Sequence, residues 1–174
     1  NLGRPGTGVN ALRGQNNVQG ACDMGALPVV FTAYQKVIDP AAHKKFTDAW
    51  KFPDGIAKGE NGYEVTVMMD VLTEKPGNLK CMYIMGENPM ISDPDLTHVE
   101  HALKTLDSLV VQDIFMNETA QLADVVLPAA CYAEKDGTQT STERRVQMWR
   151  KAQNPPGEAK GDWEIIASIA SRMG

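Results

Sequence analysis

Two groups of polar residues stand where ligand chemistry is expected, because each directly follows or closes a short apolar run. Gly86, Glu87 and Asn88 follow the first run, and Gln112 and Asp113 close the second. Both runs have the composition of buried strands, and parallel strands place their carboxyl ends at one sheet edge. Amides at such an edge bind phosphates, and amide or carboxylate side chains bind a purine. The pattern favours a nucleotide site, although a β-turn with a polar strand exit is an equally good interpretation.

A second candidate for chemistry lies near the amino terminus, in a glycine-rich segment. The first fifteen residues hold four glycines, two arginines and no carboxylate, which is typical of an irregular, positively charged loop. Arg13 presents a planar guanidinium that binds a carboxylate or phosphate through paired hydrogen bonds, and Gln15 stands two residues on. Taken by itself, the pattern also fits a solvated arginine.

Periodicity predicts the elements that position these residues. Apolar residues at helical spacing, with capping residues, predict helices; short apolar runs predict strands. The expected helices span about Ala41 to Trp50, Leu96 to Leu106 and Asp162 to Met173, and a further helix lies within the stretch 62–77, which a stop at Pro76 and Gly77 ends. The expected strands span Lys80 to Met85, Leu109 to Gln112 and Val125 to Leu127. In the last helix, Asp162 is the expected N-cap, and the side expected to be buried holds Ile165, Ile166, Ile169 and Ala170.

These elements predict an α/β fold. We expect a three-layer α/β/α, Rossmann-like and mostly parallel sheet, because a strand, a helix and a strand follow one another. The alternating stretch after Cys131 predicts a small β-hairpin, which with the last helix forms an appendage from a neighbouring domain. The expected division is an active-site loop and connecting segment over 1–40, an α/β half-domain over 41–130, and the hairpin and terminal helix over 131–174.

Composition excludes several classes of protein. A hydrophobic fraction of 43% with 22% charged residues allows a globular core, and a net charge of −5 without a basic run argues against nucleic-acid partners. No apolar run approaches the roughly 20 residues of a membrane helix. The three cysteines and three histidines are not spaced as a disulfide framework or metal site, so we expect no metal ligand and a reducing, cytoplasmic setting.

Read together, five stretches resemble a known family in the same order. They are GVNALRGQNNVQGACDMGALP, YIMGENP, VVQDIFMNETAQLADVVLPAACYAEKDGT, TERRVQ and NPPGEAKGDW. The stretches resemble those of molybdopterin-dependent formate dehydrogenase catalytic subunits, of the dimethyl sulfoxide reductase superfamily. Periplasmic nitrate reductases resemble the later stretches but not the run around Arg13, which points to the formate branch.

The resemblance implies a cofactor and roles for particular residues. Members of this family bind bis(molybdopterin guanine dinucleotide) with Mo or W, which oxidises formate to carbon dioxide. Arg13 corresponds to the arginine that holds formate, and Gln15 to a neighbour of the pterin. By the same correspondence, the expected cofactor-binding residues are Gly86, Glu87, Asn88, Gln112, Asp113, Lys135 and Asp162.

The same resemblance implies segments that this sequence does not contain. We find neither the cysteine cluster that binds a 4Fe-4S centre nor the segment with the metal-ligating cysteine or selenocysteine. We therefore expect an internal piece of a catalytic subunit, inactive and without cofactor by itself. Its expected partners are formate, the remaining domains of the subunit and an electron-transfer subunit.

Two alternatives of other kinds stay open on the sequence. One is a related molybdopterin enzyme that reduces an oxyanion such as nitrate. The other is a non-catalytic α/β module that binds a nucleotide or a protein. The flanking coding sequence would distinguish all three.

Overall fold

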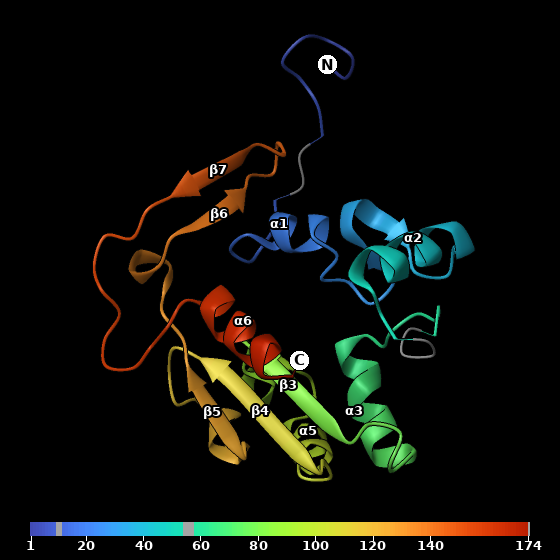
Figure 1. Ribbon diagram of the computed structural model, residues 1–174, viewed down its shortest axis with the longest axis vertical. Helices are drawn as coiled ribbons and strands as arrows, with labels where there is room; N and C mark the ends of the chain where they lie inside the picture. The colour runs from blue at the N-terminus through green and yellow to red at the C-terminus, as the bar shows by residue number, and fades with distance from the viewer. Residues whose placement is uncertain (10–11, 54–57, 174) are drawn as a thin grey trace. The chain divides into compact units, whose positions relative to one another are not determined.

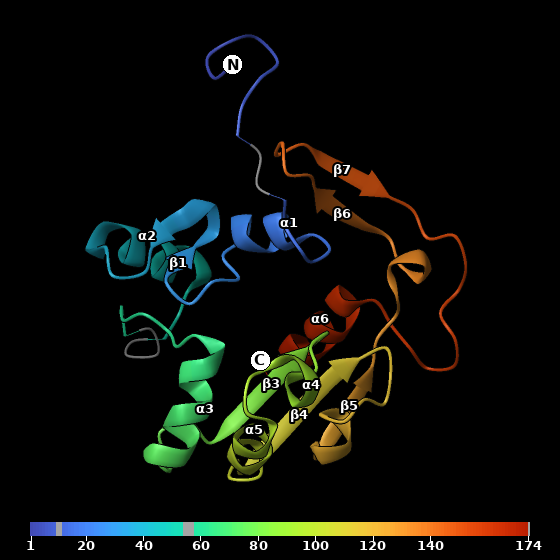
Figure 2. The ribbon, with the colours of Figure 1, turned by 180° about the vertical axis from the view of Figure 1, so that it is seen from behind.

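The structure, a computed structural model, describes residues 1–9, 12–53 and 58–173. Its chain forms two compact units, and Figures 1 and 2 show their ribbons from opposite sides. One unit comprises Asn1–Tyr63 and Thr138–Trp149, and the other comprises Glu64–Gly137 and Arg150–Gly174. We describe the second, which holds the parallel sheet, first. The boundaries expected near residues 41 and 131 stay predictions.

Three parallel strands form the sheet of this unit. Strands β3 (Cys81–Met85), β4 (Ser108–Asp113) and β5 (Val125–Pro128) lie in the order β3-β4-β5. Cys81 pairs with Ser108, and Val110 pairs with Val125, so both pairings are parallel. The three predicted strands and their parallel neighbourhood are therefore confirmed.

Helices cover both faces of this sheet. Helix α6 (Asp162–Met173) covers one face of the sheet, which Figure 1 shows. Helices α4 (Pro89–Ser92) and α5 (Leu96–Leu103) cover the other face, which Figure 2 shows from behind. Helix α3 (Val65–Glu74) packs against α5. The main core lies among α3, α5 and the sheet, and it contains Met69, Leu72, Ile84, Val99, Ala102, Leu103, Leu109, Val111 and Ala120. The predicted α/β class with three layers is confirmed.

Helix α5 is shorter than predicted. The Asp95 side chain accepts a hydrogen bond from the backbone N–H of His98 and caps the start. The helix ends at Leu103 rather than Leu106. The reason is that the chain must turn into β4: the N–H groups of Asp107 and Ser108 both donate to the carbonyl of Lys80. A helix as far as Leu106 would leave only Asp107 for that turn.

Two expectations about burial were wrong. Strand β3 was expected to be a buried strand, but Tyr83 and Met85 are 43% and 50% exposed. In α6, only Ile165 is buried, and Ile166 and Ala170 are exposed. The apolar face of α6 is wider than the part of it that packs against the rest of the unit. These exposed side chains line an apolar hollow of about 470 Å³ between β3 and α6.

The start of α6 also differs from the expected one. Asp162 is the first helical residue and not the N-cap. The Glu164 carboxylate accepts from the Gly161 backbone N–H at 2.9 Å, which is the contact of a glutamate in the first turn that reaches back to the residue before the helix. The Asp162 carboxylate is therefore available for other contacts.

The other unit is built from short elements. Asp39 caps α2 through the backbone N–H of Ala41, and Phe31, Phe46 and Trp50 form an aromatic cluster. The predicted helix over Ala41 to Trp50 and the predicted hairpin are confirmed. The elements are α1 (Val18–Asp23), β1 (Val30–Phe31), η1 (Thr32–Tyr34), β2 (Gln35–Lys36), α2 (Pro40–Trp50), β6 (Gly137–Thr140) and β7 (Val146–Trp149). Two further 3₁₀ turns in the sheet unit are η2 (Ala120–Leu122) and η3 (Tyr132–Glu134).

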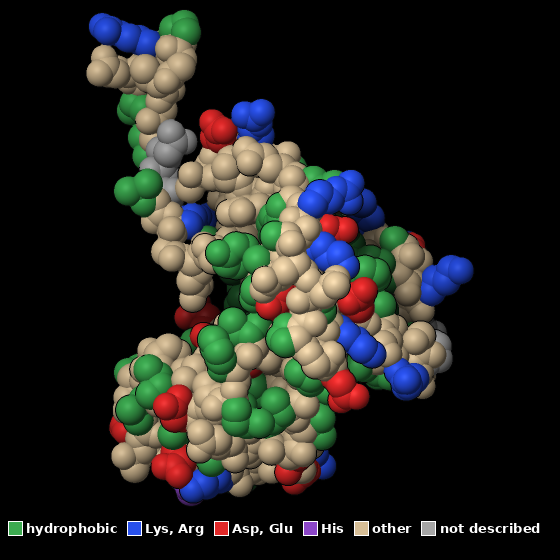
Figure 3. All heavy atoms as spheres, turned by 90° about the vertical axis from the view of Figure 1, so that its left-hand side faces the viewer, with side chains coloured by type: hydrophobic (Ala, Val, Ile, Leu, Met, Phe, Trp, Pro, Cys, Tyr) green, Lys and Arg blue, Asp and Glu red, His purple; other side chains and the backbone are tan. Residues whose placement is uncertain are grey.

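The surface carries charges of both signs. On the face in Figure 3, Lys and Arg side chains lie singly or in small groups among Asp and Glu, with separate hydrophobic patches between them. Over the described ranges, we find no helix that is both long and apolar enough to cross a bilayer. Cys22, Cys81 and Cys131 are free thiols.

Candidate functional site

Arg13 and Gln15 lie in the wall of one polar pocket. The pocket has a volume of about 340 Å³ and is lined by residues 12–13, 15–19 and 139–142. All of these belong to the unit that contains α1 and most of the β6–β7 hairpin. The hairpin side of the pocket carries an amide and three hydroxyl groups, from Gln139, Thr140, Ser141 and Thr142. Such a wall offers hydrogen bonds to a polar or anionic ligand.

Asn17 joins the two segments that line this pocket. Its backbone is left-handed, with φ 55°, a conformation that asparagine adopts more readily than most residues. Its side-chain oxygen accepts from the Thr140 backbone N–H at 2.9 Å, and its amide nitrogen donates to the Thr138 carbonyl at 3.4 Å. The start of α1 is thereby held against β6.

The Arg13 guanidinium contacts a buried amide. Its Nη2 donates to Oε1 of Gln19 at 3.3 Å, and Gln19 is only 6% exposed. The Gln19 Nε2 donates to Oδ1 of Asp23 at 2.9 Å and to the Tyr34 hydroxyl at 3.4 Å. Arg13 is thus the outer end of a hydrogen-bonded chain that begins on α1.

In the sheet unit, the structure places Gly86 at the end of β3 with room around it. Its φ of +65° is left-handed, and a Cβ built there would meet no atom within 4 Å. Its N–H donates to the Gln112 carbonyl at 2.9 Å, which extends the pairing of β3 with β4. Glu87 beside it is exposed, yet burial of the carboxyl group and then the charge of Asp93 raise its pKa.

Asn88 and Asp113 make their contacts within the loops of this edge. Oδ1 of Asn88 accepts from the hydroxyl of buried Thr119 at 2.7 Å, and its Nδ2 donates to Glu118 at 2.8 Å. The Asp113 carboxylate accepts from the Ile114 N–H at 2.6 Å and from Asn117 Nδ2 at 3.0 Å. Both side chains hold the loops in shape, and their contact with a base or ribose stays a prediction.

The structure brings Gln112, Lys135 and Asp162 together in a second network. Gln112 is fully buried, and its Nε2 donates to Oδ1 of Asp162 at 2.7 Å. Lys135 forms an ion pair with the other carboxylate oxygen, and the Tyr83 hydroxyl donates to Oε1 of Gln112. Burial, and next the charge of Asp162, raise the pKa of Tyr83, so its hydroxyl remains a donor at neutral pH.

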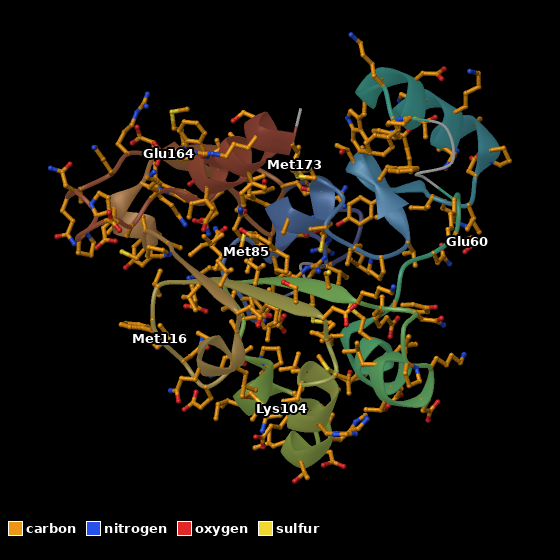
Figure 4. All side chains as sticks on the ribbon, turned by 60° about the horizontal axis from the view of Figure 1, so that its bottom comes forward. Glu60, Met85, Lys104, Met116, Glu164 and Met173 are labelled. Carbon is orange, nitrogen blue, oxygen red and sulfur yellow. The ribbon has the colours of Figure 1, made fainter. Side chains whose placement is uncertain are left out.

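The apolar hollow of the sheet unit lies on the α6 side of the sheet. Figure 4 shows Met85 on this side, Met173 at the end of α6, and Lys104 on the opposite side of the sheet. Tyr83 lines the hollow with Met85 and Ile166, so the tyrosine separates an apolar surface from the polar network at Gln112.

Sequence reasoning missed four of these residues: Asn17, Gln19, Tyr83 and Thr119. Only Gln19 left a signal, because it stands four residues before Asp23, a spacing that places two polar side chains on one helix face. No cluster of three or more His, Cys, Asp and Glu side chains suited to a metal ion occurs in the described part of the chain.

Comparisons with known proteins decide the family. The sequence profile of the molybdopterin oxidoreductases matches residues 1–172, almost the whole chain. The chain belongs to the molybdopterin oxidoreductase family. Membership implies a molybdopterin cofactor.

The chain is similar to several formate dehydrogenases of this family. It is 62% identical to the F420-dependent formate dehydrogenase subunit alpha of Methanocaldococcus jannaschii and 45% identical to formate dehydrogenase H of Escherichia coli. Both matches cover all 174 residues of this chain. It spans about a quarter of these two relatives, 25% and 24% of their lengths.

A solved molybdopterin enzyme shares the fold. Acetylene hydratase from Pelobacter acetylenicus superposes with a TM-score of 0.57 at 31% identity, over 63% of this chain and 15% of that one. This likeness supports the parallel α/β arrangement described above.

Proposed function

We propose that this chain is the part of a formate dehydrogenase catalytic subunit that supplies the substrate-binding arginine and a nucleotide-binding sheet edge. In the whole subunit, formate is oxidised to carbon dioxide, and the electrons leave through iron-sulfur clusters to a partner subunit. Similarity over the whole of this chain to proteins named as formate dehydrogenases supports the proposal.

The observation that carries the proposal is the position of Arg13. Its guanidinium lies in the wall of a polar pocket, and among the residues that the structure describes it donates to a neutral amide and not to a carboxylate. A cation whose nearest partner is neutral retains its attraction for a small anion. Formate is such an anion, and a guanidinium binds a carboxylate through two parallel hydrogen bonds.

The residues at the sheet edge fit a bound guanine dinucleotide. Open space at Gly86 lets a phosphate or sugar approach the backbone closely. Lys135 and Asp162 offer an ammonium group and a carboxylate, which can hydrogen-bond a purine base, and the buried amide of Gln112 holds the Asp162 carboxylate in place. We assign the cofactor to Gln15, Gly86, Glu87, Asn88, Gln112, Asp113, Lys135 and Asp162.

The chain and its cofactor divide the reaction between them. When bound, bis(molybdopterin guanine dinucleotide) with Mo or W supplies the redox chemistry, taking two electrons from formate as a proton is released. Arg13 binds and orients the carboxylate and stabilises its charge. In a site with little water, a fixed charge acts more strongly than in solution.

Replacement of Arg13 in the full-length subunit tests this role. Arg13→Lys keeps a positive charge but loses the planar fork, so we expect partial activity. Arg13→Ala loses both, and loss of one preorganised donor costs on the order of 2.7 to 4 kcal/mol, roughly a hundredfold or more in rate. Turnover is measured with an artificial electron acceptor, and metal content is measured for every variant.

The matched control is Arg150→Ala, which removes an exposed guanidinium 3.7 Å from Asp136. We expect this variant to keep wild-type turnover. Wild-type activity in Arg13→Ala at full metal loading would remove Arg13 from the substrate site.

A further inference from the structure

Gln19 is a buried polar side chain at the centre of the series of hydrogen bonds that ends at Arg13. It lies on α1, is 6% exposed, and uses both ends of its amide: Oε1 accepts from Arg13, and Nε2 donates to Asp23 and Tyr34. A buried amide with partners at both ends is fixed in position, because rotation would break every bond at once.

The contact with Asp23 determines which end of the amide faces Arg13. A carboxylate only accepts hydrogen bonds, so the amide nitrogen of Gln19 must point toward Asp23. Its oxygen then points toward the guanidinium, which only donates. Asp23, which does not contact Arg13, therefore determines that Gln19 presents its oxygen to the arginine.

The negative charge of Asp23 has a cation of its own. Arg144 Nη2 lies 4.0 Å from Oδ1 of Asp23, and the Arg144 guanidinium lies 5.4 Å from the centre of the Tyr34 ring. Arg144 is mostly exposed, so this ion pair is weak. Between the carboxylate and Arg13 stands a neutral amide, which transmits a hydrogen bond without bringing a negative charge to the guanidinium.

We infer that Gln19 is a positioning residue for Arg13: it holds the guanidinium with a neutral acceptor, in an orientation set by Asp23, and so preserves its positive charge for an anionic substrate. This inference rests on the proposed function, because it assigns the charge of Arg13 to a carboxylate substrate. It predicts that the affinity for the substrate depends on which of residues 19 and 23 carries the negative charge, and not only on whether their hydrogen bonds are present.

A charge swap separates these two possibilities. The double variant Gln19→Glu with Asp23→Asn keeps an acceptor toward Arg13, a hydrogen bond between positions 19 and 23, and the total charge. It moves the negative charge next to the guanidinium. In the full-length holoenzyme, we expect a wild-type melting temperature but a KM for formate raised roughly tenfold or more, the size of a hydrogen bond to a charged group, with a smaller change in kcat. An unchanged KM would show that Gln19 acts only in folding, and would overturn the inference.

The single variant Gln19→Glu places two carboxylates at the 2.9 Å contact and is expected to lower the melting temperature, which the double variant restores. The matched control is Gln35→Glu. The Gln35 Oε1 accepts from Lys45 Nζ at 3.1 Å, so the same change places a carboxylate beside another cation of the same unit. We expect no change in KM.

Nitrate binding separates failure of the inference from failure of the proposed function. Nitrate is a planar monovalent anion that does not donate electrons, so its Kd for the holoenzyme, measured by calorimetry, does not depend on turnover. Weaker binding to the double variant supports the inference, and equal Kd values contradict it. A wild-type holoenzyme with full metal content that oxidises no formate would refute the proposed function, whatever the nitrate result.

Discussion

Two glutamines, Gln19 and Gln112, are the polar residues on which the two candidate sites depend. They are 6% and 0% exposed, and each amide links a carboxylate to another side chain. Burial of an amide costs free energy unless its hydrogen bonds are made, so both side chains hold their partners in fixed positions. In each unit, a buried amide thus orients a side chain that is proposed to bind a ligand: Arg13 in one unit and Asp162 in the other.

Glu87 gives a prediction at the scale of a single residue. Burial and Asp93 raise its pKa, so ionisation of Glu87 is less favourable in the folded chain than in the unfolded one. Its contribution to stability is present below its ordinary pKa and is lost as the pH rises through the raised value. Glu87→Gln should therefore raise the melting temperature at pH 7, by roughly 1 to 2 °C, and leave it unchanged near pH 3.5.

Glu118 supplies a control of opposite sign for this measurement. A hydrogen bond from Asn88 lowers its pKa, so its contribution is present above its ordinary pKa and is lost as the pH falls. Glu118→Gln should lower the melting temperature at pH 7. A pH-independent difference between wild type and Glu87→Gln would contradict the assignment of the shift.

At the scale of elements, the loops after β3 and β4 are joined by Asn88 and Thr119. The Thr119 hydroxyl donates to Oδ1 of Asn88 at 2.7 Å and accepts from the Met90 N–H at 3.1 Å, and Thr119 is fully buried. These bonds fix the start of α4 relative to the loop that follows β4.

Thr119→Val tests this connection. The substitution keeps the shape of the side chain but leaves the Met90 N–H without its partner, whereas Asn88 Oδ1 still accepts from the Thr119 backbone N–H at 3.3 Å. An unsatisfied buried donor costs about 1 to 3 kcal/mol. Thermal unfolding measures the loss, and Thr97→Val on the exposed side of α5 is the control. Equal stability of the two variants would mean that the Asn88 contact does not hold these loops.

Periodicity and composition predicted the long elements well and the short ones poorly. The apolar run around Val110 and Val111 could only be a buried strand or helix segment, and its length decided for a strand. Strands β1 and β2 have two residues each and leave no pattern. For Ile166 the helix was correct but the buried side was not, because periodicity shows that a face is apolar and not that something covers it.

The candidate site could be predicted only in part for a similar reason. Arg13 and Gln15 lie two residues apart, so their common pocket follows from the chain itself. Gln112, Lys135 and Asp162 come from a strand, a loop and a helix start far apart in the sequence, and the resemblance to a family brought them into one prediction. No local rule could have placed Tyr83 beside them, because its hydroxyl contacts a residue of the neighbouring strand.

At the scale of the whole molecule, the sheet unit is interrupted by a segment of the other unit. The chain leaves the sheet unit after Gly137 and returns at Arg150. The residues on either side of the inserted segment are in contact. Asp136 Oδ1 accepts from the Lys151 N–H at 2.8 Å, and the Ala152 N–H donates to the Ala133 carbonyl at 2.7 Å. A short connection can therefore replace the hairpin residues 138–149.

We expect the segment 64–173, with 138–149 replaced by a short glycine-rich linker, to fold as a single module. The reason is that the main core, the sheet and the Gln112 network all belong to this unit. Amide chemical shifts of the strands, compared with those of the longer chain, measure the result. A spectrum of an unfolded chain would mean that the sheet unit needs the other unit for its stability.

The interruption also sets an order of assembly during synthesis. A chain emerges from the ribosome amino end first, and its units fold as their last residues become available. The Arg13 pocket needs residues 139–142, which are made after the whole parallel sheet. Arg13 is made long before these residues, so the substrate pocket is completed only when the hairpin follows the sheet, and Asp162 of the sheet unit follows later still.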